Sequence, residues 1–153
     1  MDNKLHRIAL TVIIYKDGKY LITKRSMQEK AFPGKWTVPG GNLETDDYIH
    51  EQPTTAAGQW YYALENGIRR EIREEVGVEI GKPKYLLDLA FIRPDNVPVV
   101  VLSYYAPYVS GEVMHDEDTA DSAWVTAAEA KTYDMIDGIA DEIDMVDKIL
   151  ESR

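Results

Sequence analysis

Apolar residues recur at spacings of three and four from about Gly58 to Val76, and this periodicity most constrains how the chain folds. Such spacing places the residues on one stripe of a helix, and that stripe must pack against another layer. Gly77 follows directly, where a glycine commonly ends a helix. We therefore predict one amphipathic helix, whose buried stripe consists of Tyr61, Leu64, Ile68, Ile72 and Val76.

Segments rich in β-branched and aromatic residues lie on both sides of this helix. Leu5–Lys16 and Lys19–Arg25 flank Asp17-Gly18, a pair typical of a tight hairpin turn. The remaining predicted elements are the strands Trp36–Val38, Tyr85–Arg93, Val97–Val109 and Ala123–Thr126, and the helices Ala127–Lys131 and Gly138–Leu150. Strands and helices mixed in this way predict a single α/β layered domain.

The chain is acidic, with a formal charge of −10 at pH 7. It lacks the basic surface that grips a nucleic-acid backbone, so nucleic acid is not an expected partner. A phosphorylated ligand would need a cation or a local cluster of Arg and Lys to offset the repulsion. No segment resembles a signal peptide or is long enough to cross a bilayer, and there is no cysteine. These features favour a cytoplasmic protein without a membrane partner.

Three glutamates stand close together near the end of the predicted helix. Glu71 and Glu75 are one turn apart on a flank of the apolar stripe, and Glu74 lies a little further round. Their mutual repulsion disfavours the cluster without a cation, and such hard oxygen ligands suit Mg²⁺ or Mn²⁺. Arg70 is placed to pair with Glu74 across one turn. The same pattern is typical of a solvated helix surface, so the flanking residues must decide between the two interpretations.

The segments around this helix resemble the Nudix box, G-x5-E-x7-R-E-U-x-E-E-x-G-U, in which U is aliphatic. Arg70–Val78 matches the second half of the box at every fixed position. Trp36–Gly41 is similar to the family's lead-in and places Gly41 as the first glycine. The resemblance covers nearly the whole chain. It implies a Nudix-like α/β/α sandwich with a mixed central sheet, formed by residues 1–153 as one domain.

Two departures lie between the halves of the box. The glutamate expected six residues after Gly41 is Asp47 here, and Glu51 or Glu65 are alternatives for its role. The box has 8 positions from this residue to the arginine, whereas Asp47 and Arg70 are 23 apart, so residues 47–66 contain 15 extra residues. We expect this insertion to extend the helix at its N-terminus, because its aromatic residues continue the apolar stripe. A lid or a dimer contact is the alternative.

By resemblance, the metal ligands are Gly41, through its carbonyl, and Glu71, Glu74 and Glu75. The implied catalytic residues are the same three glutamates with Arg70. Gly40, Gly41 and Arg25 are the implied substrate-binding residues, and Arg25 also fits an exposed salt bridge. The implied cofactor is Mg²⁺, with Mn²⁺ as a substitute.

Some family members carry a general base on the loop before a late strand. The corresponding loop here contains Glu117, which is our candidate, with Asp118 and Asp121 as alternatives. An acidic loop of this kind is more often simply solvated surface.

The resulting hypothesis is a Mg²⁺-dependent pyrophosphohydrolase. Its substrate would be a small-molecule nucleotide or nucleotide derivative, in which a nucleoside diphosphate is linked to another moiety, X. The box does not identify X. The alternative is a non-catalytic Nudix-fold module that senses a nucleotide, although the complete set of glutamates favours the enzyme. An isomerase of the same fold is disfavoured by the absence of cysteine. A homodimer remains open, since many relatives are dimers.

Overall fold

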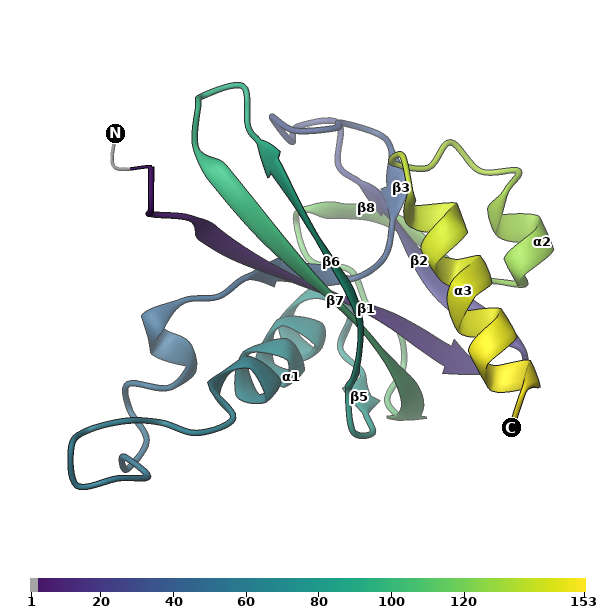
Figure 1. The fold of residues 1–153 in the computed structure, drawn as a ribbon. Helices are drawn as coiled ribbons and strands as arrows, with labels where there is room; N and C mark the ends of the chain where they lie inside the picture. Colours follow the sequence, from purple (N-terminus) through teal and green to yellow (C-terminus); the bar gives the residue numbers. More distant parts are fainter. Residues whose placement is uncertain (1–2) are drawn as a thin grey trace.

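A mixed β-sheet lies between two helical layers in the computed structural model, which describes residues 3–153 (Figure 1). Its elements are β1 (Arg7–Lys16), β2 (Lys19–Arg25), β3 (Trp36–Thr37), β4 (Gly40–Asn42), the 3-10 turn η1 (Thr45–Asp47), α1 (Ala63–Val76), β5 (Glu79–Ile80), β6 (Lys84–Ile92), β7 (Pro98–Ser110), β8 (Thr119–Val125), α2 (Ala127–Ala130) and α3 (Ile139–Glu151). The predicted α/β sandwich with a mixed central sheet is confirmed.

Strands β1 and β7 form the centre of the sheet and run parallel to each other. All other strand pairs are antiparallel, including the β1–β2 and β6–β7 hairpins. The β1–β2 turn is tight because both of its central residues adopt positive φ, 51° at Asp17 and 76° at Gly18. The short β4 pairs with β1, so that Thr11 lies opposite Gly40 and Leu10 opposite Gly41. The glycine turn is thereby fixed to the central strand.

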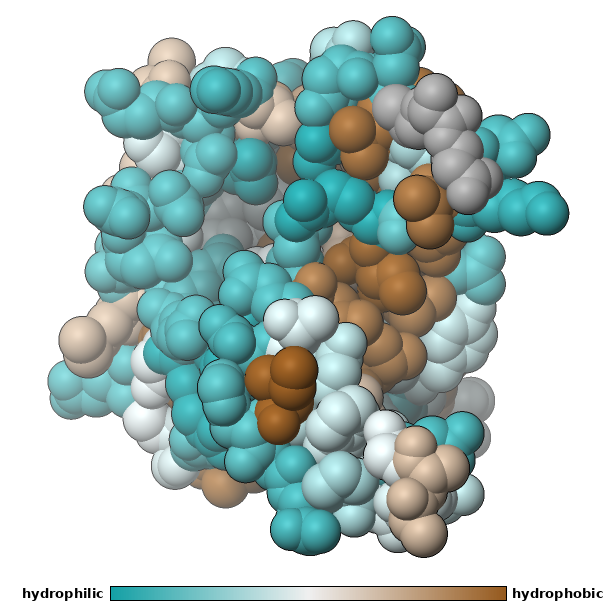
Figure 2. Space-filling model, turned by 90° about the vertical axis from the view of Figure 1, so that its left-hand side faces the viewer, coloured by the Kyte–Doolittle hydropathy of each residue, from teal (hydrophilic) through white to brown (hydrophobic). Residues whose placement is uncertain are grey.

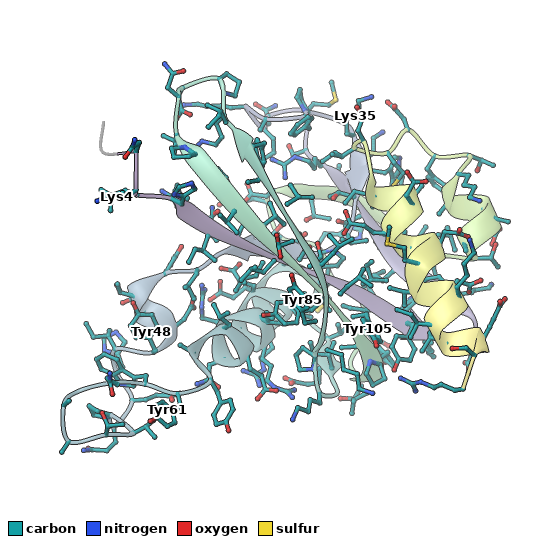
Figure 3. All side chains as sticks on the ribbon, viewed as in Figure 1. Lys4, Lys35, Tyr48, Tyr61, Tyr85 and Tyr105 are labelled. Carbon is teal, nitrogen blue, oxygen red and sulfur yellow. The ribbon has the colours of Figure 1, made fainter. Side chains whose placement is uncertain are left out.

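Two hydrophobic cores form on opposite faces of the sheet. On one face α1 buries its predicted stripe, Ile68, Ile72 and Val76, against β1 and β7. On the other face α3 covers part of the sheet, and Ile13, Tyr105 and Ile143 belong to this second core. Figure 3 shows Tyr105 beside α3. Alternating side chains of the central strands therefore belong to different cores, as the pleat of a strand requires.

The predicted start of the long helix near Gly58 is wrong, because α1 begins at Ala63. Tyr62, the residue before it, has a φ of 62°, a left-handed conformation that a right-handed helix cannot contain. Gly58 is also left-handed, with a φ of 84°. Tyr61 is exposed and does not join the buried stripe. The apolar spacing continues through this segment, but the helical backbone conformation does not.

The insertion forms an irregular loop that is stabilised by contacts among its own residues. It does not extend the helix. The Trp60 ring packs at 5.2 Å from the Tyr48 ring, and Trp60 Nε1 donates to the Glu51 carbonyl at 2.9 Å. The backbone N–H of Thr54 donates to the carbonyl of Gln59 at 2.7 Å, closing a turn. Figure 3 places Tyr48 and Tyr61 in this segment, which projects at the lower left.

Strand β6 is only partly covered. Leu89, Phe91 and Ile92 are exposed, and Figure 2 shows a connected area of apolar residues on the side of the molecule that carries the N-terminus and the β6–β7 hairpin. Among residues 3–153, no helix has the length and apolar character needed to cross a membrane.

Candidate active site

The candidate site is built on a glycine turn that leaves no room for side chains. A Cβ placed on Gly41 would overlap the Glu71 carboxylate, and one placed on Gly40 would overlap the backbone carbonyl of Leu10. The two glycines therefore allow a flank of α1 to approach the backbone of β4 directly. This juxtaposition joins two sequence segments that are 30 residues apart.

Glu75 is bonded to this turn, because the backbone N–H of Gly40 donates to Glu75 Oε2 at 2.9 Å. Burial raises the pKa of Glu75 to about 7, although the Gly40 hydrogen bond acts in the opposite direction. The charges of Asp116 and Glu71 raise this pKa further, and that of Arg25 lowers it. A carboxylate held this way gains from any nearby positive charge that offsets its desolvation.

Glu71 lies against Gly41 one turn earlier on the same flank. Burial raises its pKa, Arg70 lowers it, and the neighbouring carboxylates of Asp47, Glu74 and Glu44 raise it. Glu71 and Glu75 thus both meet the glycine turn, as the helical spacing predicts.

Arg70 links four carboxylates beside the turn. Its guanidinium donates to Glu74 Oε2 at 2.6 Å, to Glu71 Oε1 at 2.7 Å and to Asp47, and it lies 3.8 Å from Glu44. The hydrogen bond with Asp47 is the largest of the interactions that raise the pKa of Arg70. The predicted pairing of Arg70 with Glu74 is confirmed.

Asp47 takes the position opposite Arg70 for which three acidic residues were candidates. Its side chain is fully buried, whereas Glu51 accepts from Asn66 and Glu65 lies 3.9 Å from Arg69. A Cβ on Gly67 would lie 3.1 Å from Asp47 Oδ2 and 3.2 Å from Leu43 Cδ1, so a larger residue there would crowd the Asp47 side chain. This close approach is one reason for a glycine inside the helix.

The glutamates do not form a closed ion-binding cage in this conformation. Within residues 3–153, no three Asp, Glu, His or Cys side chains are arranged to hold one metal ion. Glu71 and Glu75 face the glycine turn, but the Glu74 side chain is 60% exposed and its carboxylate points to Arg70. The candidate donors are therefore two carboxylates at the turn with a third at its edge.

Arg25 lies close enough to Glu75 for its charge to lower that residue's pKa. Its Nε donates to the Ala31 carbonyl at 2.8 Å, and its guanidinium lies 3.4 Å from Glu29. The sequence suggested either a phosphate-binding residue or a surface ion pair. Arg25 forms the ion pair with Glu29, and its charge also lowers the pKa of Glu75.

In the acidic loop before β8, Asp116 acts electrostatically on Glu75, and the role expected for Glu117 stays a prediction. Asp116 is half-buried and its charge acts on Glu75. Glu117 is exposed. Asp118 is hydrogen-bonded with Glu29, and Asp121 accepts from the backbone of Ser122. The sequence indicated an acidic neighbour of the site in this loop, and Asp116 is a further candidate beside Glu117, Asp118 and Asp121.

Comparisons with known proteins agree with this geometry. The profile of the NUDIX domain matches residues 4–144. Nucleoside triphosphatase NudI of Escherichia coli is 28% identical over 139 residues, covering 84% of this chain and 88% of the relative.

Solved structures share the fold. The NUDIX domain of Shewanella oneidensis NrtR, complexed with ADP ribose, has a TM-score of 0.72 at 18% identity and covers 98% of this chain and 94% of that one. The MutT protein from Methanosarcina mazei has a TM-score of 0.71 at 20% identity, covering 97% of each chain.

Proposed function

The chain belongs to the NUDIX family and is a Nudix hydrolase, and from that membership we propose that it is a Mg²⁺-dependent pyrophosphohydrolase. The bond cleaved is the diphosphate linkage of a nucleoside diphosphate joined to another moiety, X. A nucleoside triphosphate is one such compound, and the similarity to a nucleoside triphosphatase supports a nucleotide substrate. Mn²⁺ is the expected substitute metal.

One observation carries this proposal: two carboxylates from a single flank of α1 lie against a turn that has no side chains. Gly40 bonds Glu75, and the Glu71 carboxylate fills the space above Gly41. Carboxylates of like charge in such a place favour a bound cation, because burial has already removed part of their hydration.

The donor set fits a hard divalent cation. The residues that would hold it are the Gly41 carbonyl and the carboxylates of Glu71, Glu74 and Glu75, all of them oxygen donors. Mg²⁺ bound there would offset the charge of the substrate phosphates and polarise their P–O bonds. Arg70 holds Glu74 at the edge of this set by the hydrogen bond of 2.6 Å.

Arg25 is the residue that we assign to the substrate phosphates. The Ala31 carbonyl fixes its Nε, and its remaining N–H groups are free to exchange Glu29 for a phosphate oxygen. Such a contact would orient the diphosphate over the glycine turn. It also reduces the repulsion that a chain of charge −10 exerts on an anionic substrate.

Asp116 is the residue that we assign as acceptor of the proton from the attacking water, with Glu117 as the alternative. The influence of Asp116 on the pKa of Glu75 supports this choice. Replacing Asp116 by Asn should lower kcat by about 100-fold or more, while Glu117→Gln should stay within about threefold of the wild type. The opposite ranking would return the role to Glu117.

A nucleotide sensor without turnover is the second candidate. The similarity to the NrtR domain in complex with ADP ribose favours a bound nucleotide, although that likeness extends only to the fold. The result that would identify a sensor is nucleotide binding, measured by calorimetry, with no product released at any Mg²⁺ concentration.

The proposed reaction is tested with a panel of deoxynucleoside triphosphates, ADP-ribose, a nucleotide sugar and a dinucleoside polyphosphate. Product release is measured with Mg²⁺, with Mn²⁺ and with EDTA. We expect metal-dependent release from at least one compound. Glu75→Gln should lose roughly 100-fold or more in rate while remaining folded. The control Glu79→Gln removes an exposed partner of Arg73 and should retain the wild-type rate. Equal rates for Glu75→Gln and the wild type would contradict the mechanism.

A further inference from the structure

The outer edge of strand β6 has no strand beside it. On its inner side β6 pairs with β7, and within residues 3–153 no strand pairs with its other side. Figure 1 shows the β6–β7 hairpin extending beyond α1 and α3 at the top of the molecule. An unpaired edge of this kind presents a row of free backbone N–H and C=O groups to any strand that approaches it.

The hairpin closure shows which backbone groups of β6 are free. The N–H of Arg93 donates to the carbonyl of Val97 across the hairpin at 3.0 Å, and the register of the adjoining β6–β7 ladder is regular. Hydrogen-bonded and non-hydrogen-bonded pairs alternate along an antiparallel ladder. The N–H and C=O groups of Asp88, Ala90 and Ile92 therefore point away from β7.

The side chains along this edge are exposed and mostly apolar. All five residues from Asp88 to Ile92 are exposed. The exposed fraction is 65% at Ile92 and 39% at both Leu89 and Phe91. A hydrophobic edge strand left open in this way is a site of association unless proline, a bulge or charged side chains protect it.

These protective features are weak along β6. The strand contains no proline, and its register shift lies between Tyr85 and Leu87, before the exposed part. Between Lys84 and Arg93 the sequence has one charged residue, Asp88, and the Tyr85 hydroxyl donates to its carboxylate. Residues 89–92 therefore carry no charge that would keep another strand away.

The charge of the hairpin also permits two copies of the chain to meet there. The whole chain carries −10, so the acidic surfaces of two copies repel each other. Residues 84–97 are neutral overall, because Lys84 and Arg93 balance Asp88 and Asp95. Arg93 and Asp95 also pair with each other at 2.7 Å. Two copies that approach through this hairpin therefore meet less repulsion than their acidic surfaces impose.

We propose that a second copy of this chain pairs with the outer edge of β6, antiparallel to it and about a two-fold axis at Ala90. Such an interface uses the same surface on both copies. The free backbone groups of Ala90 meet those of Ala90 in the second copy, and those of Asp88 meet those of Ile92. Leu89 lies opposite Phe91 of the second copy in a non-hydrogen-bonded pair, where side chains are closest. The exposed apolar side chains thus cover one another.

Asp88 favours this register over its neighbours. An axis at Asp88 would place the two carboxylates directly opposite each other, and an axis at Leu89 would place them diagonally. An axis at Phe91 would set Asp88 opposite Pro94, which has no N–H to donate. The axis at Ala90 avoids all three conflicts. A single pair of strands lies at the low end of interface size, so the dimer should be weak, with a Kd in the micromolar range.

The test is sedimentation velocity of the wild type from about 5 to 500 µM, a range that brackets such a Kd. We expect a monomer that converts to a dimer as the concentration rises. Leu89→Lys places a charge on the edge, and Ala90→Pro removes the N–H at the axis without removing a β6–β7 hydrogen bond. Each should raise the Kd by at least about tenfold, with the circular dichroism spectrum unchanged. The control Met145→Lys makes the same kind of change at an exposed position on α3 and should keep the wild-type Kd.

A single introduced thiol reports the register, because the chain has no cysteine. Ala90→Cys brings two thiols together at the axis, where the Cα atoms of a hydrogen-bonded pair are about 5.5 Å apart. A short bismaleimide should therefore link two copies of Ala90→Cys and should not link Met145→Cys at the same concentration.

Three results would overturn the proposal. They are a wild type that stays monomeric up to the highest concentration, a dimer that neither Leu89→Lys nor Ala90→Pro weakens, and a dimer that Ala90→Cys fails to cross-link. None of these measurements involves hydrolysis, so the proposed function stands or falls separately.

Discussion

The carboxylate of Glu71 fills the space that a side chain on Gly41 would need. This contact fixes how closely α1 approaches β4. It also keeps a charged oxygen beside the backbone of the glycine turn. The proposed metal site depends on this closeness, because carboxylates on a helix flank share an ion with a backbone carbonyl only when the two elements touch.

Substitution of Gly41 by Ala should therefore impair activity more than stability. The added Cβ displaces the Glu71 carboxylate and moves one donor out of reach. We expect kcat to fall by at least about tenfold, because small misplacements at a reacting centre have large effects. Steady-state hydrolysis at saturating Mg²⁺ measures this. A variant with the wild-type kcat would show that Glu71 needs no fixed position against the turn.

The ion pair between Asp47 and Arg70 should stabilise the fold. Asp47 is fully buried, so Asp47→Asn leaves Arg70 without its strongest partner. We expect a loss of about 3 kcal/mol in the free energy of unfolding, measured by urea denaturation. The control Asp46→Asn changes an exposed neighbour that pairs with His50, and its effect should be under about 0.5 kcal/mol. Equal effects of the two substitutions would remove Asp47 from this role.

Glu142 should make the protein less stable as pH rises. Burial raises its pKa in the folded state above the unfolded value of about 4.3, and only the Ser103 hydrogen bond opposes this. A group with a raised folded pKa contributes its full stability below the unfolded pKa and loses that contribution as pH rises through the folded pKa. Glu142→Gln does not titrate. Its stability relative to the wild type should therefore increase from pH 4 to pH 8 in urea unfolding. A constant difference across this range would contradict the shift.

Local chemistry made much of this fold predictable from the sequence. Asp17-Gly18 predicts the tight hairpin because few other pairs adopt positive φ twice in succession. Ile68, Ile72 and Val76 predict α1 because their spacing matches a helix turn. Gly67 also indicates a close approach in the sequence, since a glycine inside a helix is unfavourable unless a neighbouring group needs the space.

The insertion was not predictable by the same reasoning. Trp60 has the spacing of the buried stripe, yet its ring packs on Tyr48 within the insertion itself. A periodic pattern predicts that a side chain will be buried. Tertiary contacts determine which residues it packs against. The short strands β4 and β5 were missed because they are ordered by pairing with β1 and β7 and not by their own sequences.

The candidate site was only partly predictable. The helix geometry fixed Glu71, Glu74 and Glu75 relative to one another. It also predicted that Glu71 and Glu75 share a flank, whereas the hydrogen bonds of Arg70 with both Glu71 and Glu74 could only be partly anticipated. Asp116 was not singled out from the sequence, because the conformation of a loop decides which of several adjacent acidic residues is half-buried, and their order carries no signal for it.

The central claim is that Glu71 and Glu75 at the glycine turn bind a divalent cation. The most direct test measures Mn²⁺ binding by electron paramagnetic resonance, with and without inorganic pyrophosphate. We expect a saturable site in the wild type that Mg²⁺ competes for. Mn²⁺ affinity should fall by about tenfold or more in Glu75→Gln and remain unchanged in Glu79→Gln. Equal Mn²⁺ affinity in the wild type and Glu75→Gln, in both the presence and absence of pyrophosphate, would contradict the account.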